Sequence, residues 1–162
     1  MTAMRDTTSI LPLAVEGVSF EIGGRRLIDG LDLRFERGGL TVLLGPNGAG
    51  KSLIMRLCHG LVQPTTGVVR WAVEGGRRGS AKAHAMVFQK PVMLRRSAFA
   101  NLTHALAAAG VGFADRRRRA GEALERFRLA HLADRPARVL SGGEQQRLAI
   151  ARAWALDATV FF

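Results

Sequence analysis

The sequence G-P-N-G-A-G-K-S at residues 45–52 constrains this chain more than any other stretch. It matches the pattern G-x-x-x-x-G-K-[ST] in full, and it lies between the apolar run 40–44 and a helical segment. Gly45, Gly48 and Gly50 let backbone amides turn inward, because no Cβ stands in the way. Together with the N-terminus of the next helix, these amides form a positively polarised nest. The loop therefore predicts a phosphate site on an α/β fold.

Two side chains at the end of this phosphate loop carry specific chemistry. The Lys51 ammonium is expected to reach the terminal phosphates, and the Ser52 hydroxyl is expected to ligate Mg²⁺. The alternative is a glycine-rich turn between a strand and a helix that binds nothing, and the complete motif in its required context disfavours it. The predicted site residues are Gly45, Pro46, Asn47, Gly48, Ala49, Gly50, Lys51 and Ser52.

The helix expected after the loop has one apolar face, formed by Ile54, Leu57, Cys58 and Leu61. Cys58 is therefore expected in the core rather than as a reactive thiol. His59 is expected to be structural, near a helix C-terminus where positive charge is favourable. A single cysteine excludes an internal disulfide and fits a reducing compartment.

The charge of the chain is strongly positive, with 24 Lys+Arg against 13 Asp+Glu. Such a balance suits nucleic acid or an anionic membrane surface as a partner. The arginines are scattered, however, and aromatic residues for base stacking are few, so nucleic acid is not favoured. The four consecutive arginines at 116–119 cannot share one helix face, and most of them are expected to be solvated.

The sequence shows no membrane span of its own, because no stretch approaches the ~18 consecutive apolar residues required. The first residues combine an acid and a proline with a short apolar run, which makes a poor signal peptide. We therefore expect a cytoplasmic protein, and any work at a membrane would need another subunit to supply the span.

Hydrophobic periodicity predicts an α/β fold with a helical insertion. The run 40–44 is apolar throughout, as expected of a parallel strand buried on both faces. The predicted strands are 13–22, 27–35, 40–44, 68–73, 84–89 and 158–162, and the predicted helices are 53–62, 97–128 with a break at 110–112, and 140–156.

A second motif, L-S-G-G-E at 140–144, marks the start of the last helix. Ser141 is predicted to cap this helix, and Glu144 completes a capping box three residues later. Gly142 and Gly143 leave the helix entrance bare, and a bare helix N-terminus with a hydroxyl group attracts anions. From capping alone, an ordinary capped helix is an equally good interpretation.

The order of three motifs resembles the ATP-binding cassette of ABC transporters: G-P-N-G-A-G-K-S, then V-F-Q-K, then L-S-G-G-E-Q-Q-R. The resemblance extends over 13–162 and implies ATP and Mg²⁺ as cofactors. It implies that two cassettes pair head to tail and enclose two ATP molecules. Gln89 would contact Mg²⁺ and water, so the implied metal contacts are Ser52 and Gln89. The residues implied to face the partner's ATP are Ser141, Gly142, Gly143 and Glu144.

The same resemblance implies three parts: an ATP-binding core with an antiparallel β-subdomain at 13–90, a helical subdomain at 91–139, and the signature helix with the start of a strand at 140–162. The interval of 52 residues between Gln89 and Ser141 fits a transporter-type helical subdomain. A soluble family member acting on nucleic acid or the ribosome would need a second cassette or a long insertion, and neither is present.

Within this family, the chain most resembles the ATP-binding subunits of inorganic-anion importers, those for tungstate in particular and those for phosphate next. The implied partners are a transmembrane permease, which would dock at residues 91–100, and a solute-binding protein that acts indirectly. The protein would then lie on the inner face of the cell membrane. Export instead of import stays open as an alternative, because nothing physical in the chain reads the cargo.

The sequence departs from the family pattern at the expected adenine contact. Family members usually place an aromatic residue before the first glycine turn, whereas this chain has Ile22 there, with Phe20 on the same face of the strand. Phe20 could substitute for the missing aromatic, or Ile22 could provide only an apolar contact. Leu53 also stands where a threonine is common, which would remove one phosphate contact.

The other departure concerns catalysis. The resemblance places a Mg²⁺-binding aspartate and a catalytic glutamate after the strand that begins near Thr159, and the sequence ends at Phe162. No catalytic residue is therefore assigned, since Asp157 precedes that strand. We expect a fragment of a complete cassette, incomplete at its C-terminus. The alternative is a short protein that binds nucleotide without hydrolysing it. An uncovered apolar strand also predicts poor solubility.

Overall fold

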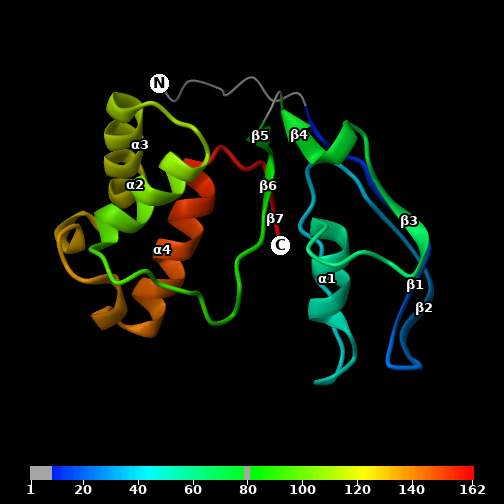
Figure 1. Ribbon diagram of the computed structural model, residues 1–162. Helices are drawn as coiled ribbons and strands as arrows, with labels where there is room; N and C mark the ends of the chain where they lie inside the picture. The colour runs from blue at the N-terminus through cyan, green and yellow to red at the C-terminus, as the bar shows by residue number, and fades with distance from the viewer. Residues whose placement is uncertain (1–8, 79–80) are drawn as a thin grey trace. The chain divides into compact units, whose positions relative to one another are not determined.

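The computed structural model describes residues 9–78 and 81–162, and the chain divides into two compact units (Figure 1). The first unit ends at Met86 and also includes Phe162, and the second runs from Val87 to Phe161. Each unit has its own hydrophobic core. The phosphate loop belongs to the first unit. The L-S-G-G-E motif at 140–144, called the signature motif below, belongs to the second unit.

An antiparallel sheet of three strands, in the order β2-β1-β3, forms the frame of the first unit. β1 spans Leu13–Ile22, β2 spans Arg25–Phe35 and β3 spans Thr66–Trp71. Gly23 and Gly24 both have positive φ, which suits the two-residue turn of a hairpin. The sheet confirms the predicted antiparallel β-subdomain.

An irregularity in β1 keeps its apolar side chains on the core face. Leu13 and Val15 are buried with the period of two that a strand imposes. The register against β2 shifts between Val15 and Val18, and Gly17 adopts a φ of 57° there. This irregularity turns Val18 rather than Gly17 toward the core, where Val18 is fully buried.

The helix after the phosphate loop packs on the apolar residues of β1 and β2. This helix, α1, spans Lys51–His59 and buries Leu57 and Cys58. Cys58 is a core residue, as predicted, and burial raises the pKa of its thiol to about 11. The prediction for Leu61 is wrong, because Gly60 ends the helix with a φ of 78° and leaves Leu61 52% exposed.

The apolar run 40–44 differs from its prediction as a buried parallel strand. It forms no strand, and Leu40 and Leu44 are 92% and 88% exposed. A strand buried on both faces needs neighbours that pair with its backbone and helices that cover its side chains. Within residues 9–78 and 81–162, no strand pairs with this run, and its apolar side chains therefore face solvent.

Short elements complete the first unit after β3. They are η1 (Glu74–Gly76), β4 (Arg77–Arg78), β5 (Ala81–Lys82) and β6 (His84–Ala85). β4 and β5 pair antiparallel. The strand predicted at 84–89 is thus limited to its first two residues.

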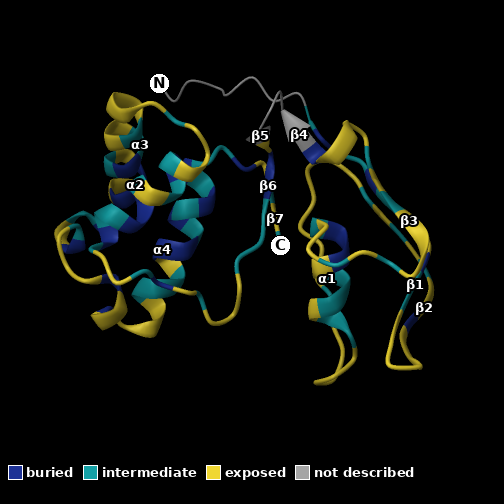
Figure 2. Cartoon of the chain, viewed as in Figure 1, coloured by how far each residue is buried: buried dark blue, intermediate teal, exposed yellow. Residues whose placement is uncertain are grey.

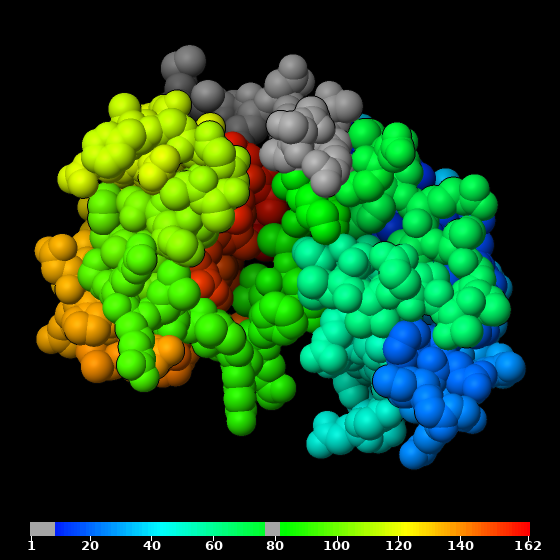
Figure 3. Space-filling model, viewed as in Figure 1, coloured from blue at the N-terminus to red at the C-terminus, as the bar shows by residue number. Residues whose placement is uncertain are grey.

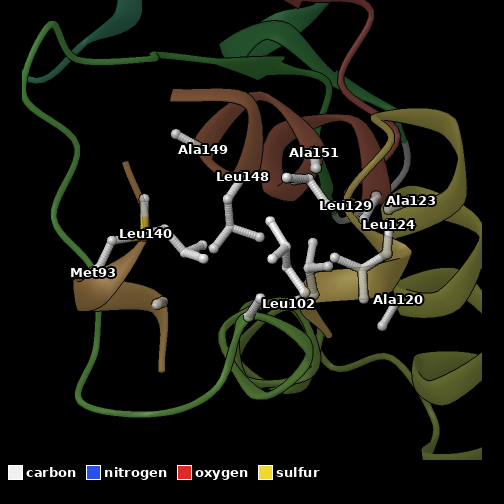
Figure 4. Close-up of a cluster of buried hydrophobic side chains, with 14 of the residues drawn as sticks. Met93, Leu102, Ala120, Ala123, Leu124, Leu129, Leu140, Leu148, Ala149 and Ala151 are labelled. Atoms are coloured by element: carbon white, nitrogen blue, oxygen red, sulfur yellow. The ribbon is translucent and has the colours of Figure 1, made fainter. Parts of the chain in front are cut away.

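Three helices pack around an alanine- and leucine-rich core in the second unit (Figure 4). α2 spans Ala98–Ala108, α3 spans Phe113–Arg126 and α4 spans Gly142–Ala155. The remaining elements of this unit are η2 (Ala130–Leu132), η3 (Ala137–Val139) and β7 (Val160–Phe161). Each helix turns its buried residues inward (Figure 2).

The predicted break at 110–112 separates α2 from α3, and Gly110 adopts a φ of 77° there. The beginning of α3, yellow-green in Figure 3, lies at the surface, and Phe113 is 72% exposed. None of the helices in the described part of the chain is long and apolar enough to cross a membrane.

Candidate functional site

The phosphate loop wraps around the side chain of its own lysine. The Lys51 ammonium donates hydrogen bonds to the carbonyl oxygens of Gly45 and Pro46, at 2.8 Å and 2.7 Å. Gly48 and Gly50 adopt φ values of 86° and 84°, which side chains other than glycine rarely accept. The positive charge of Lys51 therefore lies at the exposed end of the loop. An anion that binds there can replace the two backbone carbonyl oxygens as its acceptors.

The N-terminus of α1 adds partial positive charge to the same place. Gly50 is the N-cap, and in the described part of the chain no side chain accepts a hydrogen bond at this cap. The first turn contains no acidic residue. Its amides and the helix dipole are thus available to an anion. A Cβ at Gly50 would lie 3.0 Å from Cδ1 of Ile28, so the loop also packs closely against β2.

The hydroxyl of Ser52 is exposed in the first turn of α1. A neutral oxygen donor of this kind fits Mg²⁺, which usually takes few protein ligands and several oxygens from phosphate and water. Gln89 offers a second neutral oxygen, but it belongs to the second unit. Among the residues that the structure describes, no group of three His, Cys, Asp or Glu side chains is placed to hold a metal ion.

The two candidates for the adenine contact have different surroundings. Phe20 is half-buried and packs against the core of the first unit. Ile22, at the end of β1, is 62% exposed. Ile22 therefore presents an apolar surface to solvent, whereas the Phe20 ring already has a packing role.

The start of α4 forms the capping box that the sequence predicts. The Glu144 carboxylate accepts hydrogen bonds from the backbone amide and the hydroxyl of Ser141, at 2.7 Å and 2.8 Å. The Ser141 hydroxyl in turn accepts from the Glu144 amide at 3.4 Å. These bonds from Ser141 hold the pKa of Glu144 below its usual range. Gly142 and Gly143 are exposed, so an anion can approach the helix entrance.

Side chains of the second unit hold the backbone of segment 88–93, which follows β6 and contains Gln89. Arg152, on α4, donates to the carbonyl oxygen of Val92 at 3.0 Å. Arg138, just before α4, donates to that of Met93 at 3.0 Å, and Gln146 donates to that of Phe88 at 3.4 Å. The signature helix and segment 88–93 are thus parts of one packed body, which sequence reasoning did not predict.

A buried asparagine fixes the next residues of the same segment. Asn101, on α2, is 1% exposed and accepts a hydrogen bond from the Leu94 amide at 3.0 Å. Its amide group donates to the carbonyl oxygens of Ser97, Arg96 and Leu94, at 2.9 Å, 3.2 Å and 3.4 Å. A lone asparagine on the inner face of an alanine- and leucine-rich helix is a signal that the sequence offered and that we missed.

The surface of segment 88–97 is apolar and basic. Phe88 and Val92 are 42% and 73% exposed. Lys90, Arg95 and Arg96 are also exposed. No acidic residue occurs between positions 87 and 114. This surface therefore suits a partner that offers apolar and acidic side chains.

The four arginines at 116–119 lie in the first half of α3, where Arg117 and Arg118 are exposed, in line with the expectation of solvated side chains, and Arg116 and Arg119 are half-buried. The partners are the Val111 carbonyl for Arg116, the Phe99 ring for Arg117, Asp115 and Glu122 for Arg118, and Asp157 for Arg119. Because successive residues point in different directions around a helix, each arginine meets a different neighbour. The run therefore gives no support to a nucleic-acid surface.

Comparison with known proteins places these elements in one family. The family described as "ABC transporter" matches residues 28–162. The chain is 35% identical over 155 residues to the sn-glycerol-3-phosphate import ATP-binding protein UgpC 1 of Rhizobium johnstonii, covering 93% of this chain and 42% of that protein. It is 36% identical to the sulfate/thiosulfate import ATP-binding protein CysA of Rhodopseudomonas palustris, covering 93% and 45%. The chain thus spans less than half the length of these relatives.

A shorter relative and a solved structure agree with this assignment. The chain is 33% identical to the tungstate uptake system ATP-binding protein TupC of Peptoclostridium acidaminophilum, covering 90% of this chain and 68% of that protein. Among solved structures it is similar to cbiO1 from Clostridium perfringens, part of the ABC transporter complex cbiONQ. That similarity has a TM-score of 0.78 at 27% identity and covers 92% of this chain and 63% of that one.

Proposed function

This chain belongs to the ABC transporter family, and on that premise we propose that it binds ATP as the nucleotide-binding part of an importer. The observation that carries the proposal is the phosphate loop, in which Lys51 lies at the N-terminus of α1 with its ammonium on two loop carbonyls. The relatives named for import of glycerol phosphate, sulfate, iron(III) and tungstate support the import class.

The loop binds the triphosphate by exchanging its internal contacts. The Lys51 ammonium leaves the carbonyls of Gly45 and Pro46 and pairs with the terminal phosphate oxygens, which are the stronger acceptors because they are charged. The free amides of the first turn of α1 donate to the same phosphates. Ser52 would be a ligand of Mg²⁺, which neutralises phosphate charge when it is bound, and the family resemblance implies Gln89 as a further contact. Ile22 supplies an apolar surface for the base.

The signature motif serves a second copy of the chain. In the arrangement that the family resemblance implies, the entrance of α4 faces the ATP bound to the partner's phosphate loop. Gly142 and Gly143 offer unshielded amides there, and the single proton of the Ser141 hydroxyl would turn from Glu144 to the phosphate. Glu144 would then keep its bond to the Ser141 amide, so that its negative charge still stabilises the helix start.

Hydrolysis is a property that we assign to the whole protein and not to these 162 residues. A positioned general base contributes typically about 10²–10⁴-fold to such a rate. The carboxylate nearest to the last strand in sequence, Asp157, pairs with Arg119 at 2.6 Å. We therefore propose that the chain binds ATP without measurable turnover.

A transmembrane permease is the partner that segment 88–97 fits. Its exposed apolar residues and exposed basic residues suit a helix with an apolar face and acidic flanks. Such docking would place the protein on the inner face of the cell membrane. The proposed cargo is an inorganic anion of the tungstate class, supported by the similarity to TupC.

Equilibrium binding of a fluorescent ATP analogue, with and without Mg²⁺, tests the proposed function. Lys51→Ala should weaken binding at least about tenfold, the effect of losing one charge-assisted contact to phosphate. Lys90→Ala is the matched control, because Lys90 is exposed in the second unit. Equal affinities for the two variants would overturn the assignment of the phosphate loop. Cassette-like turnover by the 162-residue chain would contradict the division between binding and hydrolysis.

A further inference from the structure

A second segment, residues 135–139, lies beside segment 88–97 and widens its basic surface. It immediately precedes the signature motif. The Ala137 amide donates a hydrogen bond to the carbonyl oxygen of Arg96 at 2.8 Å, and an isolated antiparallel β-bridge joins the same two stretches of backbone. Both segments belong to the second unit, where they are held side by side (Figure 1). Together they are called the basic face below.

The basic face has a local excess of positive charge. Its five basic side chains are all exposed, and within residues 9–78 and 81–162 none of them forms an ion pair with a carboxylate. The two segments contain no acidic residue. The acids that flank residues 135–139 most closely in sequence are Asp134 and Glu144, and the Glu144 carboxylate is bonded to Ser141 in the helix cap. The five basic residues are Lys90, Arg95, Arg96, Arg135 and Arg138.

Exposed apolar side chains lie among these cations. Phe88 is 42% exposed, Val92 is 73% exposed and Val139 is 70% exposed. A mixture of exposed apolar and basic side chains suits the surface of an anionic membrane, where apolar groups enter the headgroup region and cations meet lipid phosphates. Four of the five cations are arginines, and a guanidinium group forms paired hydrogen bonds with phosphate oxygens. The basic face therefore matches such a surface in both its charge and its apolar character.

We propose that the free chain binds anionic phospholipid through the basic face. The contact goes beyond the proposed function, because it needs neither ATP nor a permease. Attraction to the lipid surface would concentrate the chain at the membrane and speed its encounter with a permease, which then replaces the lipid at segment 88–97. A lipid surface is favoured over an acidic protein because it offers phosphates and an apolar layer to both segments at once. Nucleic acid is the weaker alternative, since base stacking needs more aromatic rings than Phe88 alone.

Sedimentation with unilamellar vesicles tests the proposal on the full 162-residue chain. The probes are vesicles made of equal parts of phosphatidylglycerol and phosphatidylcholine, and vesicles of phosphatidylcholine alone. We expect binding to the anionic vesicles to be at least about tenfold stronger, and to weaken as the salt concentration rises, because ions screen the attraction. The vesicles without net charge measure any contact made by the exposed apolar run 40–44, which needs no lipid charge.

Charge reversal at two arginines locates the contact. Arg95→Glu together with Arg135→Glu should weaken binding to the anionic vesicles at least about tenfold. Arg25→Glu together with Arg56→Glu is the matched control, because both arginines are exposed in the first unit and the net charge of the chain changes equally. This control should lose at most about twofold, since charges far from the contact are screened. Val139→Ser should weaken binding without changing its salt dependence.

A second pair of changes guards against a variant that fails to fold. Lys90→Glu together with Arg96→Glu should reproduce the loss, and the unfolding midpoint of each variant identifies the folded ones. Lys51→Ala should lose ATP but keep the vesicles, so that failure of nucleotide binding and failure of lipid binding are recognised separately. The proposal is overturned if the chain binds neither kind of vesicle or both equally, which would leave an acidic protein as the partner of the basic face. Equal losses in the reversed and control variants would overturn it as well.

Discussion

The guanidinium of Arg152 donates a hydrogen bond to the carbonyl oxygen of Val92 across 3.0 Å, and so joins the middle of α4 to segment 88–93. These residues are sixty positions apart in the sequence. The contact matters for the proposed function, in which one end of the linked body would face a permease and the other would face the partner's ATP. Burial lowers the pKa of this guanidinium, which is nevertheless charged at any physiological pH.

Arg152→Ala should loosen segment 88–93 and lower the free energy of unfolding by about 1–2 kcal/mol, since one charge-assisted hydrogen bond is lost. Hydrogen exchange should accelerate at the amides of Met93 and Leu94, and urea denaturation should report the stability loss. Arg147→Ala on the same helix is the control and should stay within about 0.5 kcal/mol. Equal exchange rates in the two variants would show that Arg152 does not hold this segment.

Asn101→Ala should cost about 2–3 kcal/mol, because several backbone groups of residues 94–97 lose their partner while they stay partly buried. The midpoint of urea denaturation gives the measurement. Thr103→Ala is the matched change on the same helix, where the hydroxyl makes a single long contact of 3.4 Å. If both variants unfold at the same urea concentration, the role assigned to Asn101 is wrong.

Local features of the fold could be predicted because their partners are close in sequence. The capping box joins Ser141 to Glu144, three residues away, and the hairpin between β1 and β2 turns on Gly23 and Gly24. Helix and strand periods are likewise local signals. These features carry most of the candidate site, since the phosphate loop and the signature motif are short continuous stretches.

Contacts between distant residues could not be predicted from the same signals. Arg119 meets Asp157 across 38 positions, and nothing in an arginine run indicates which neighbour each residue will meet. The run 40–44 shows a second limit of prediction from sequence. Its apolar pattern indicates that the segment favours burial, but whether it is buried depends on which other strands are present to cover it.

Ser141→Ala should destabilise α4 by about 1 kcal/mol, the usual cost of losing an N-cap. Glu144 also makes the free energy of unfolding depend on pH. The sign follows from the pKa of Glu144, which is lower in the folded chain than in the unfolded chain. Its stabilising contribution is present above the unfolded pKa, ~4.3, and is lost as the pH falls through the folded value. Thermal unfolding of wild type and Glu144→Gln over this pH range checks the sign, because the loss should be larger in the wild type, while Asp115 contributes equally to both.

His84, which is buried, and His59, which is half-buried, predict a loss of stability on mild acidification. Their pKa values are lower in the folded chain, to about 4 for His59, so the unfolded chain takes up protons first. Between pH ~6.5 and ~4, stability should fall as the pH drops. His59→Phe should flatten this slope, whereas His104→Phe on the surface should not. A slope that His59→Phe leaves unchanged would contradict the lowered pKa of His59 in the folded chain.

The exposure of Leu40 and Leu44 predicts a low solubility of the chain, because both side chains are almost fully exposed. An exposed apolar segment with strand propensity favours association between molecules. The double change Leu40→Thr and Leu44→Thr should therefore raise the soluble concentration, measured by light scattering, while the unfolding midpoint stays the same. Leu57→Thr is the contrasting variant, since Leu57 is buried in the first unit and its loss should lower that midpoint. A lower unfolding midpoint in the double variant would show that the run 40–44 is covered in solution.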